Sequence, residues 1–359
     1  MKKLIALFLG VTMVLSGCGM GSDKSADAIE KYGSDTLKFY NWGEYVGEDV
    51  INNFQREYGV KVISEYFDSN EMMYTKIQAG DVYDVLVPSD YMIQRLIEND
   101  YLMELDKSLI PNEEFLYEGV KNLDFDPEGK YSVPYFWGSV GIVYNKNNVD
   151  IKDLEKEGFN ILKNTKYKGN IYIYDSERDA FMVALKALGY SMNTDNEAEI
   201  DEAYNWLVEL NNTMEPAYVT DEVIDSMVNG TKDMAIVYSG DAAYILSENE
   251  DMGFFMPSTG TNIWCDAMVI PKNAENPKLA HEFINYILSY DASYDNSYTV
   301  GYASTNKFVL DDMSCEGGEY YENEAYIPRT DNPNDEVFKD NIVLKEKLSN
   351  LWIKVKASN

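Results

Sequence analysis

The sequence predicts an α/β protein made of two lobes, each an open and mainly parallel sheet flanked by helices. Short apolar runs alternate with segments of helical period from Leu37 onward, and the same alternation restarts after Gly138. A chain of 359 residues is long enough for two lobes of ordinary size. The repeated alternation and the length together indicate two lobes.

The first part of the chain is expected to form three strand–helix units. The strands are predicted at residues 37–40, 60–67 and 84–87, and the helices that follow them at 48–58, 70–79 and 90–98. Strands and helices that alternate at this spacing form βαβ units, whose strands are parallel. Asp84 and Asp90 are interpreted as turn and helix-cap residues, because carboxylates at such positions bond free helix amides.

The rhythm continues beyond Gly138. Strands are predicted at 170–174 and 234–238, and helices at 179–188 and 197–211. Residues 336–354 have apolar positions of helical period and predict a last helix that packs on its lobe. The only histidine, His281, falls in the amphipathic run 277–288 and is expected on the solvent-facing side of that helix.

The N-terminus has the features of an export signal. Two lysines precede the apolar stretch 4–15, which has the length of a signal-peptide core and is too short to span a bilayer. The run Leu15-Ser16-Gly17-Cys18 looks like the lipobox of a bacterial lipoprotein, so residues 1–17 are expected to be a signal peptide and Cys18 to carry a diacylglycerol. Residues 18–33 would then tether an extracytoplasmic protein to the cell membrane. An ordinary secretory signal with an incidental cysteine is the alternative.

Composition narrows the classes of function. The formal net charge of −32 repels nucleic acid and anionic lipid headgroups and permits a cationic ligand. A single histidine argues against a His-based metal site or a Ser-His-Asp triad, and no Gly-rich phosphate loop or G-x-S-x-G elbow is present. The chain is therefore expected to be no enzyme and to hold no metal or cofactor. Cys265 and Cys315 could pair in an oxidising compartment or could equally stay free.

Candidate binding residues recur where predicted strands end, as an aromatic side chain beside a carboxylate or hydroxyl. They are Trp42, Glu44, Tyr45, Ser89, Tyr91, Ser176, Asp179, Tyr238, Asp241, Trp264, Asp266 and Tyr302. Strand ends of open α/β sheets converge, so these side chains are expected to meet in one cleft. Carboxylates accept charged hydrogen bonds from ammonium groups, while Trp and Tyr rings pack on methylenes and attract cations. The pattern indicates a site for a linear diamine or triamine.

Five runs, in order along the chain, carry a family resemblance. They are residues 39–46 (FYNWGEYV), 83–89 (YDVLVPS), 131–138 (YSVPYFWG), 263–271 (IWCDAMVIP) and 301–302 (GY). They resemble the spermidine/putrescine-binding proteins of ABC importers. The resemblance implies a type II periplasmic-binding-protein fold with two crossovers between lobes. Lobe 1 would take 34–138 and 264–310, and lobe 2 would take 139–263 and 311–359. It also implies a monomer that closes on a polyamine and delivers it to the transmembrane permease subunits.

Carried over position by position, the resemblance assigns roles to these side chains. Trp42 and Tyr45 would form an aromatic wall with Trp264 opposite, and Tyr302 would close the box. Asp266 would be the main carboxylate for an ammonium group. Additional polar contacts are expected from three further residues: Ser89, Tyr91 and, more weakly, Glu44.

Several positions depart from the family pattern. Ser176 stands where spermidine binders have an aspartate, Tyr238 where they have a tryptophan, and Phe338 near the place of a ligand-binding glutamine. Asp179 replaces a glutamate, and Asp241 looks like the carboxylate that putrescine-preferring relatives use. The sequence therefore leaves putrescine and spermidine both open. A binder of a sugar or ferric ion, or a surface sensor of polyamines, remains an alternative.

Overall fold

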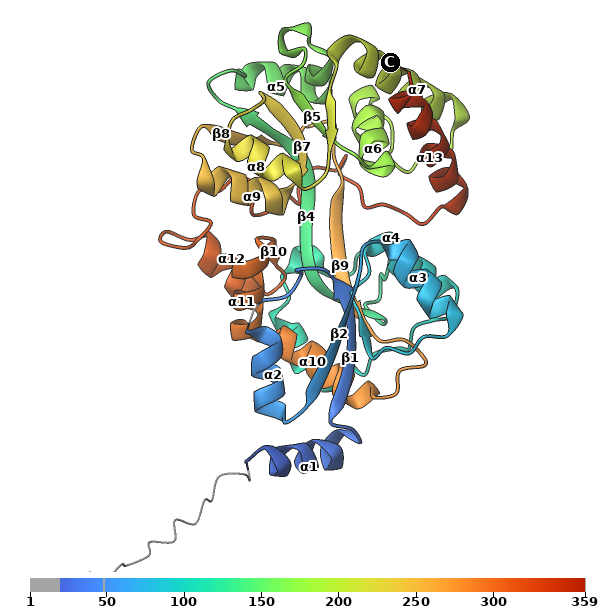
Figure 1. The fold of residues 1–359 in the computed structure, drawn as a ribbon, viewed down its shortest axis with the longest axis vertical. Coiled ribbons are helices and arrows are strands. Elements are labelled where there is room, and N and C mark those ends of the chain that lie inside the picture. The colour runs from blue at the N-terminus through green and yellow to red at the C-terminus, as the bar shows by residue number, and fades with distance from the viewer. Residues whose placement is uncertain (1–19, 48, 359) are drawn as a thin grey trace, which may run out of the picture.

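The computed structural model describes residues 20–47 and 49–358 of the chain. Figure 1 shows two α/β lobes stacked along the long axis of the molecule, joined by long strands that run from one lobe into the other. The first lobe contains the N-terminal strands, and the second contains the elements between residues 151 and 255 together with the C-terminal helix.

The sheet of the first lobe begins with parallel strands, as the βαβ pattern predicts. β1 (Thr36–Trp42) lies between β2 (Lys61–Phe67) and β3 (Val85–Leu86) and pairs with both in parallel. The connecting helices are α2 (Val50–Tyr58), α3 (Asn70–Ala79) and α4 (Asp90–Glu98). Their predicted positions are confirmed to within two residues. α3 is capped by Ser69, whose Oγ accepts a hydrogen bond from the amide of Met72 at 3.2 Å.

The second lobe repeats this arrangement. β5 (Ile171–Tyr174) pairs in parallel with β6 (Ala217–Val219) on one side and β7 (Met234–Tyr238) on the other. The helices of this lobe are α5 (Ile151–Glu157), α6 (Glu177–Leu188), α7 (Glu197–Met214), α8 (Glu222–Val228) and α9 (Ser239–Glu248). A short edge strand, β8 (Met252–Phe255), completes the sheet.

Two long antiparallel strands join the lobes. β4 (Ser132–Asn145) pairs with β9 (Ile263–Val269) over its first half and with β7 and β8 over its second half. β9 also meets β3, and β10 (Ala303–Ser304) pairs with β4. All of these contacts are antiparallel, so each sheet is mixed and not mainly parallel as predicted. The difference arises because β4 and β9 return through both lobes instead of being connected by crossover helices.

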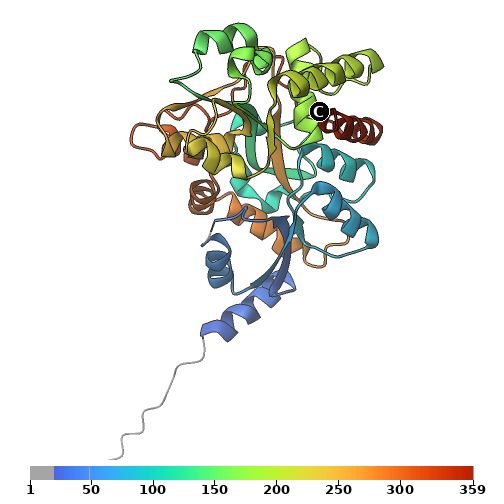
Figure 2. The same cartoon turned by 45° about the horizontal axis from the view of Figure 1, so that its top comes forward.

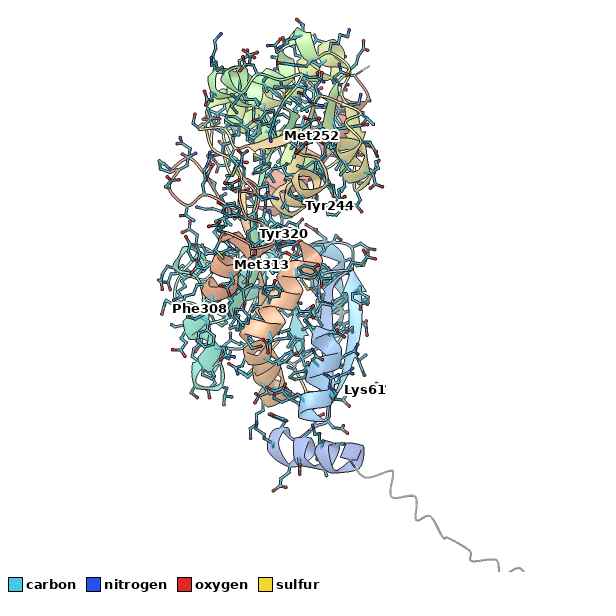
Figure 3. All side chains as sticks on the ribbon, turned by 90° about the vertical axis from the view of Figure 1, so that its left-hand side faces the viewer. Lys61, Tyr244, Met252, Phe308, Met313 and Tyr320 are labelled. Carbon is cyan, nitrogen blue, oxygen red and sulfur yellow. The ribbon has the colours of Figure 1, made fainter. Side chains whose placement is uncertain are left out.

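The chain passes between the lobes a third time near its C-terminus. α10 (Pro277–Ile287), α11 (Tyr290–Val300) and α12 (Lys307–Ser314) belong to the first lobe. α13 (Ile342–Lys356) packs against α6 and α7 of the second lobe (Figure 2). In between, the loop after α12 runs along α9, where Asn323 Nδ2 donates to the carbonyl oxygen of Ala243 at 2.8 Å. Figure 3 places Tyr320 of this loop below Tyr244 of α9.

The last helix begins later than predicted. Residues 336–341 are not helical. Glu336 bonds outside the helix: its amide donates to the carbonyl oxygen of Thr261 at 3.0 Å, and its carboxylate pairs with Lys186. Asn341 then caps α13 through its side chain.

His281 is buried and not on the solvent-facing side of α10, so that prediction is wrong. Its Nδ1 lies 2.6 Å from the carbonyl oxygen of Pro277, and its Nε2 accepts from the amide of Asp106 at 2.9 Å. A neutral ring satisfies both contacts, and it ties α10 to η1 (Lys107–Leu109).

The segment predicted to be a tether forms a helix from residue 20 onward. This helix, α1 (Met20–Tyr32), lies at the end of the first lobe farthest from the second lobe (Figures 1 and 2). Lys24 Nζ donates to the carbonyl oxygen of Arg56 at 3.0 Å, Ser25 Oγ donates to Asp35 at 2.6 Å, and Ala28 is buried. The predicted signal peptide and Cys18 lie outside the described residues.

Cys265 is buried and Cys315 is exposed, and the two are free thiols. Over residues 20–47 and 49–358, no helix combines the length and apolar character that a membrane span requires. The three short 3₁₀ segments after residue 106 are η1, η2 (Pro111–Phe115) and η3 (Glu118–Val120); two more, η4 (Gly158–Lys163) and η5 (Thr165–Tyr167), follow α5.

Candidate functional site

The first lobe contributes a buried carboxylate on β9. Asp266 accepts a hydrogen bond from the hydroxyl of Tyr45 at 2.9 Å, and its backbone forms a bridge with Ser89 at the end of β3. Burial raises the pKa of Asp266 to about 6, although hydrogen bonds from Ser89 and Tyr45 favour its charged form. Tyr45, Ser89 and Asp266, three of the predicted residues, therefore lie together.

Asp90 lies beside this group and was not predicted as a site residue. It is fully buried at the start of α4, where its Oδ1 accepts from the amide of Tyr91 at 2.7 Å and its Oδ2 from the amide of Cys265 at 3.3 Å. Burial, together with the charge of Asp266, raises the pKa of Asp90 to about 8. The prediction that Asp90 bonds a helix amide is confirmed, but Ser89 occupies the cap position. Asp84 instead holds the amides of Lys38 and Asn276, both at 2.8 Å.

Three aromatic rings connect this group to the second lobe. The ring centroid of Tyr302 lies 6.0 Å from that of Tyr45 and 4.9 Å from that of Trp264, and both pairs are edge-to-face. Trp264 in turn lies 6.4 Å from Tyr238 of β7. The indole Nε1 of Trp264 is buried and has no hydrogen-bond partner among the described residues. A buried donor without a partner is costly, which is typical of a site that a ligand completes.

Two glycines permit these rings to approach the backbone. A Cβ atom at Gly138 would lie 2.3 Å from the ring of Trp264, and one at Gly240 would lie 2.3 Å from the ring of Tyr302. Gly240 is the second residue of α9 in the second lobe, whereas Tyr302 belongs to the first, so the second contact crosses the boundary between lobes. Any larger residue at Gly240 would separate the lobes at this point.

The second lobe contributes its own carboxylates. Asp179 on α6 is buried and accepts from the hydroxyl of Tyr238 at 2.8 Å through Oδ2, while its Oδ1 has no partner among the residues described. Burial raises the pKa of Asp179. Ser176 is the N-cap of α6, and its Oγ accepts a hydrogen bond from the amide of Asp179 at 3.4 Å. It therefore stabilises the first turn of α6, which bears the Asp179 carboxylate.

Asp241 lies in the first turn of α9. Burial, together with the negative charge of Asp221, raises its pKa to about 7. Asp221 accepts from the hydroxyl of Tyr174 at 3.4 Å, and the Tyr174 ring lies 5.2 Å from that of Tyr238. Tyr174 and Asp221 thus adjoin the predicted residues, and the sequence prediction missed both. The signal for Tyr174 was its place at the end of a predicted strand.

The other predicted residues lie elsewhere or have other partners. Glu44 is exposed at a positive φ of 50°, in the turn after β1. Trp42 is half-buried against Phe67, with a centroid distance of 4.5 Å, and donates through Nε1 to the carbonyl oxygen of Val87 at 2.9 Å. Tyr91 is near Ser89, but its hydroxyl accepts from Asn70 and its ring face is covered by a guanidinium group.

The arrangement presents carboxylates and aromatic rings that can hold a cation. Asp179, Asp241 and Asp266 form no ion pair with any lysine or arginine in the part of the chain described. A contact path of Tyr45, Tyr302, Trp264 and Tyr238 links Asp266 of the first lobe to Asp179 of the second. Burial raises the pKa of each of these carboxylates, and at Asp179 the positive charge of Arg178 offsets part of that rise.

A polar and aromatic site shared by the facing surfaces of two α/β lobes, joined by strands that act as connectors, defines an extracytoplasmic solute-binding protein. The comparison with family models supports the assignment to this class. The chain belongs to the bacterial extracellular solute-binding proteins, whose family model matches residues 49–325. The prediction that the chain is not an enzyme is confirmed by this membership, since the family consists of binding proteins.

Several known proteins are similar to this chain over most of its length. The spermidine/putrescine-binding periplasmic protein of Escherichia coli (strain K12) is 34% identical over 275 residues, which cover 76% of this chain and 78% of that protein. The structure of the spermidine/putrescine ABC transporter substrate-binding protein PotD from Streptococcus pneumoniae is 35% identical, with a TM-score of 0.78, covering 90% of this chain and 99% of the other. The Tp0655 (TpPotD) lipoprotein of Treponema pallidum is 26% identical, with a TM-score of 0.76 over 89% of this chain and 99% of that one.

Proposed function

We propose that this chain captures a short linear polyamine, putrescine or spermidine, outside the cytoplasm and delivers it to an ABC importer. The carrying observation is a set of carboxylates, buried Asp179 and Asp266 and half-buried Asp241, that form no ion pair in the described structure. A path of aromatic rings links Asp266 to Asp179. Two ammonium groups supply the missing positive charge, and the methylenes between them pack on the rings. Of the relatives named above, the Escherichia coli protein is a spermidine/putrescine-binding protein, and the Streptococcus pneumoniae protein is the substrate-binding protein of a spermidine/putrescine ABC transporter.

The proposed cycle is a hinge closure. The lobes are joined by β4, β9 and the C-terminal segment, and bending in these connections opens and closes the site. A ligand that touches both lobes favours the closed form, because only that form offers all of its contacts. The transmembrane permease subunits then recognise the closed protein, which acts as a monomer.

We further propose that the protein is anchored by lipid at Cys18. The support is the lipobox-like run that ends at Cys18 and the similarity to a lipoprotein of Treponema pallidum. Growth with radiolabelled palmitate tests the anchor. Label is expected in the membrane fraction for the wild-type protein and absent from the Cys18→Ala variant. Equal labelling of both would contradict the anchor without touching ligand binding.

Titration calorimetry tests the ligand. Binding heats with dissociation constants in the micromolar range or tighter are expected for putrescine or spermidine. Maltotriose and ferric citrate, offered under the same conditions, cover a sugar and a ferric ion and are expected to give no heat. If no diamine or triamine gave a binding heat, the polyamine assignment would be contradicted.

A further inference from the structure

One cationic side chain crosses from the second lobe to the first. Arg178 is the second residue of α6, and its side chain is 17% exposed. Its guanidinium carbon lies 3.6 Å from the ring centroid of Tyr91 on α4, and its Nη2 lies 3.3 Å from the Oε1 of Glu71 on α3. Figure 1 shows α3 and α4 in the first lobe and α6 in the second. The contact therefore spans the two lobes.

The surface that receives Arg178 is held in place by hydrogen bonds within the first lobe. Asn70 is buried, and its Nδ2 lies 3.0 Å from the hydroxyl of Tyr91 and 3.1 Å from the Oγ of Ser89. The amide of Ser89 donates to Asn70 Oδ1 at 3.1 Å. Because Tyr91 is bonded to Asn70 of α3, and Asn70 is in turn bonded to Ser89, the Tyr91 ring is expected to keep its orientation whether or not the second lobe is near.

The guanidinium group of Arg178 also lies near carboxylates from both lobes, which approach one another when the lobes close. Its positive charge favours the ionised forms of Asp90 in the first lobe and Asp179 in the second. Closing the lobes without a ligand brings these acids together and costs free energy. Arg178 offsets part of that cost with a charge that belongs to the protein.

We propose that Arg178 is a positioning residue that clasps the lobes in the closed form and sets how long a ligand stays bound. This inference rests on the proposed capture of a polyamine between the lobes. The stacking on Tyr91 and the ion pair with Glu71 exist only when α6 meets α3 and α4. They therefore stabilise the closed form alone and slow its opening, while the approach of a ligand to the open form does not involve them.

Stopped-flow kinetics with putrescine and spermidine test the clasp. Arg178→Gln is expected to raise the dissociation rate about 10-fold, the scale of a desolvated cation–π contact combined with an ion pair, and to change the association rate less than about two-fold. The matched control is Lys76→Gln. Lys76 pairs with Glu65 at 3.3 Å and lies 4.8 Å from the ring centroid of Tyr40, all within the first lobe. This control is expected to leave both rates unchanged.

Two substitutions of Tyr91 separate the clasp from a direct ligand contact. Tyr91→Phe keeps the ring face for Arg178 and loses only the hydroxyl, so its dissociation rate is expected to stay near that of the wild type. Tyr91→Leu loses the face and is expected to match Arg178→Gln, with no further change in the double variant. A Phe variant as fast as the Leu variant, or an Arg178→Gln effect on association alone, would overturn the proposal.

Small-angle scattering gives a readout that needs no ligand. The ligand-free Arg178→Gln protein is expected to have a larger radius of gyration than the wild type, whereas Lys76→Gln keeps the wild-type value. Wild-type protein that binds no polyamine contradicts the proposed function, and the scattering of the same variants still decides the clasp. Equal radii for all three proteins, with equal dissociation rates, contradict the clasp alone.

Discussion

The carboxylates of the two lobes differ in how fully their oxygens are hydrogen-bonded. In the first lobe, Asp266 lies on a strand between two others and accepts a hydrogen bond from Tyr45, and Asp90 accepts two backbone hydrogen bonds. In the second lobe, Asp179 leaves one oxygen without a partner, and Asp241 has no side-chain hydrogen bond in the described structure. Both Asp179 and Asp241 lie in the first turns of helices that follow strands.

This difference suggests an order of events for the proposed binding. A carboxylate already fixed by hydrogen bonds loses little freedom when it receives an ammonium group, whereas an unpartnered one gains most from it. We therefore expect the first lobe to hold the ligand first and the second lobe to complete the site. Each of the following measurements tests the contrast between the lobes.

The largest effect is expected from Asp266→Asn. The substitution removes the charged partner of an ammonium group and disturbs the hydrogen bond from Tyr45. Charge-assisted hydrogen bonds of about 1.5–3 kcal/mol correspond to an affinity loss of roughly 10- to 100-fold for putrescine by calorimetry. Unchanged affinity would move the main ammonium site to the second lobe.

A change of pH is expected to weaken binding about 10-fold between pH 8 and pH 6. In the ligand-free protein the pKa values are about 7 for Asp241 and about 6 for Asp266, so lowering the pH protonates carboxylates that an ammonium group needs ionised. Calorimetry in buffers of different ionisation heat is expected to detect proton release on binding near pH 6.5. A flat affinity profile would mean that these carboxylates do not contact the cation.

The same carboxylates predict how stability depends on pH without a ligand. Their pKa values are raised above the ordinary value of 3.8, so between about pH 4 and pH 7 the native state binds more protons than the unfolded state. Their contribution to the free energy of unfolding therefore falls as pH rises through this range. Thermal melts are expected to show this contribution reversed by saturating putrescine.

Asp241→Asn is expected to cost somewhat less, about 5- to 10-fold in affinity, because this carboxylate joins the ligand after the first lobe has bound it. The variant is also expected to flatten the pH profile between pH 8 and pH 6, because the group with the pKa nearest 7 is gone. If Asp241→Asn weakens binding more than Asp266→Asn does, the order of the two lobes is reversed.

The smallest change in affinity is expected from Ser176→Ala. Ser176 caps α6 behind Asp179 and was predicted to contact the ligand. Loss of an N-cap costs about 1 kcal/mol of stability, measured as the free energy of unfolding in urea. We expect the affinity for putrescine to change less than about two-fold. A larger loss of affinity would assign Ser176 to the ligand after all.

Periodicity predicted the βαβ parts of both lobes because their helices and strands follow local patterns. It did not predict the antiparallel strands β4 and β9, since pairing between residues such as Trp137 and Cys265 depends on partners far apart in the sequence. His281 was misplaced for a related reason. Its hydrogen bond to Asp106 lies across 175 residues, and an amphipathic pattern cannot reveal it.

For the candidate site, the strand-end pattern brought Tyr45, Asp266, Trp264, Tyr302 and Tyr238 into one contact path. It could not separate a helix cap such as Ser176 from a residue that faces the site, because both follow a strand. It also missed the neighbours Asp90, Tyr174 and Asp221, whose roles depend on packing between segments. Contact of these residues with a ligand stays a prediction, which the variants above test for Asp266 and Ser176.

The docked helix α1 has a consequence for reach. With a lipid at Cys18, the connection to α1 would consist of residues 18 and 19 alone. Two residues span at most about 7 Å. The far end of the first lobe would then stay at the bilayer surface, and the second lobe would be the part that swings. Release of α1 from Arg56 and Asp35, followed by unfolding of the helix, would lengthen the connection to about 50 Å, the span of roughly 15 extended residues. If Cys18 is lipidated, as proposed, a few hydrogen bonds on one short helix would set how far the two lobes can move from the membrane.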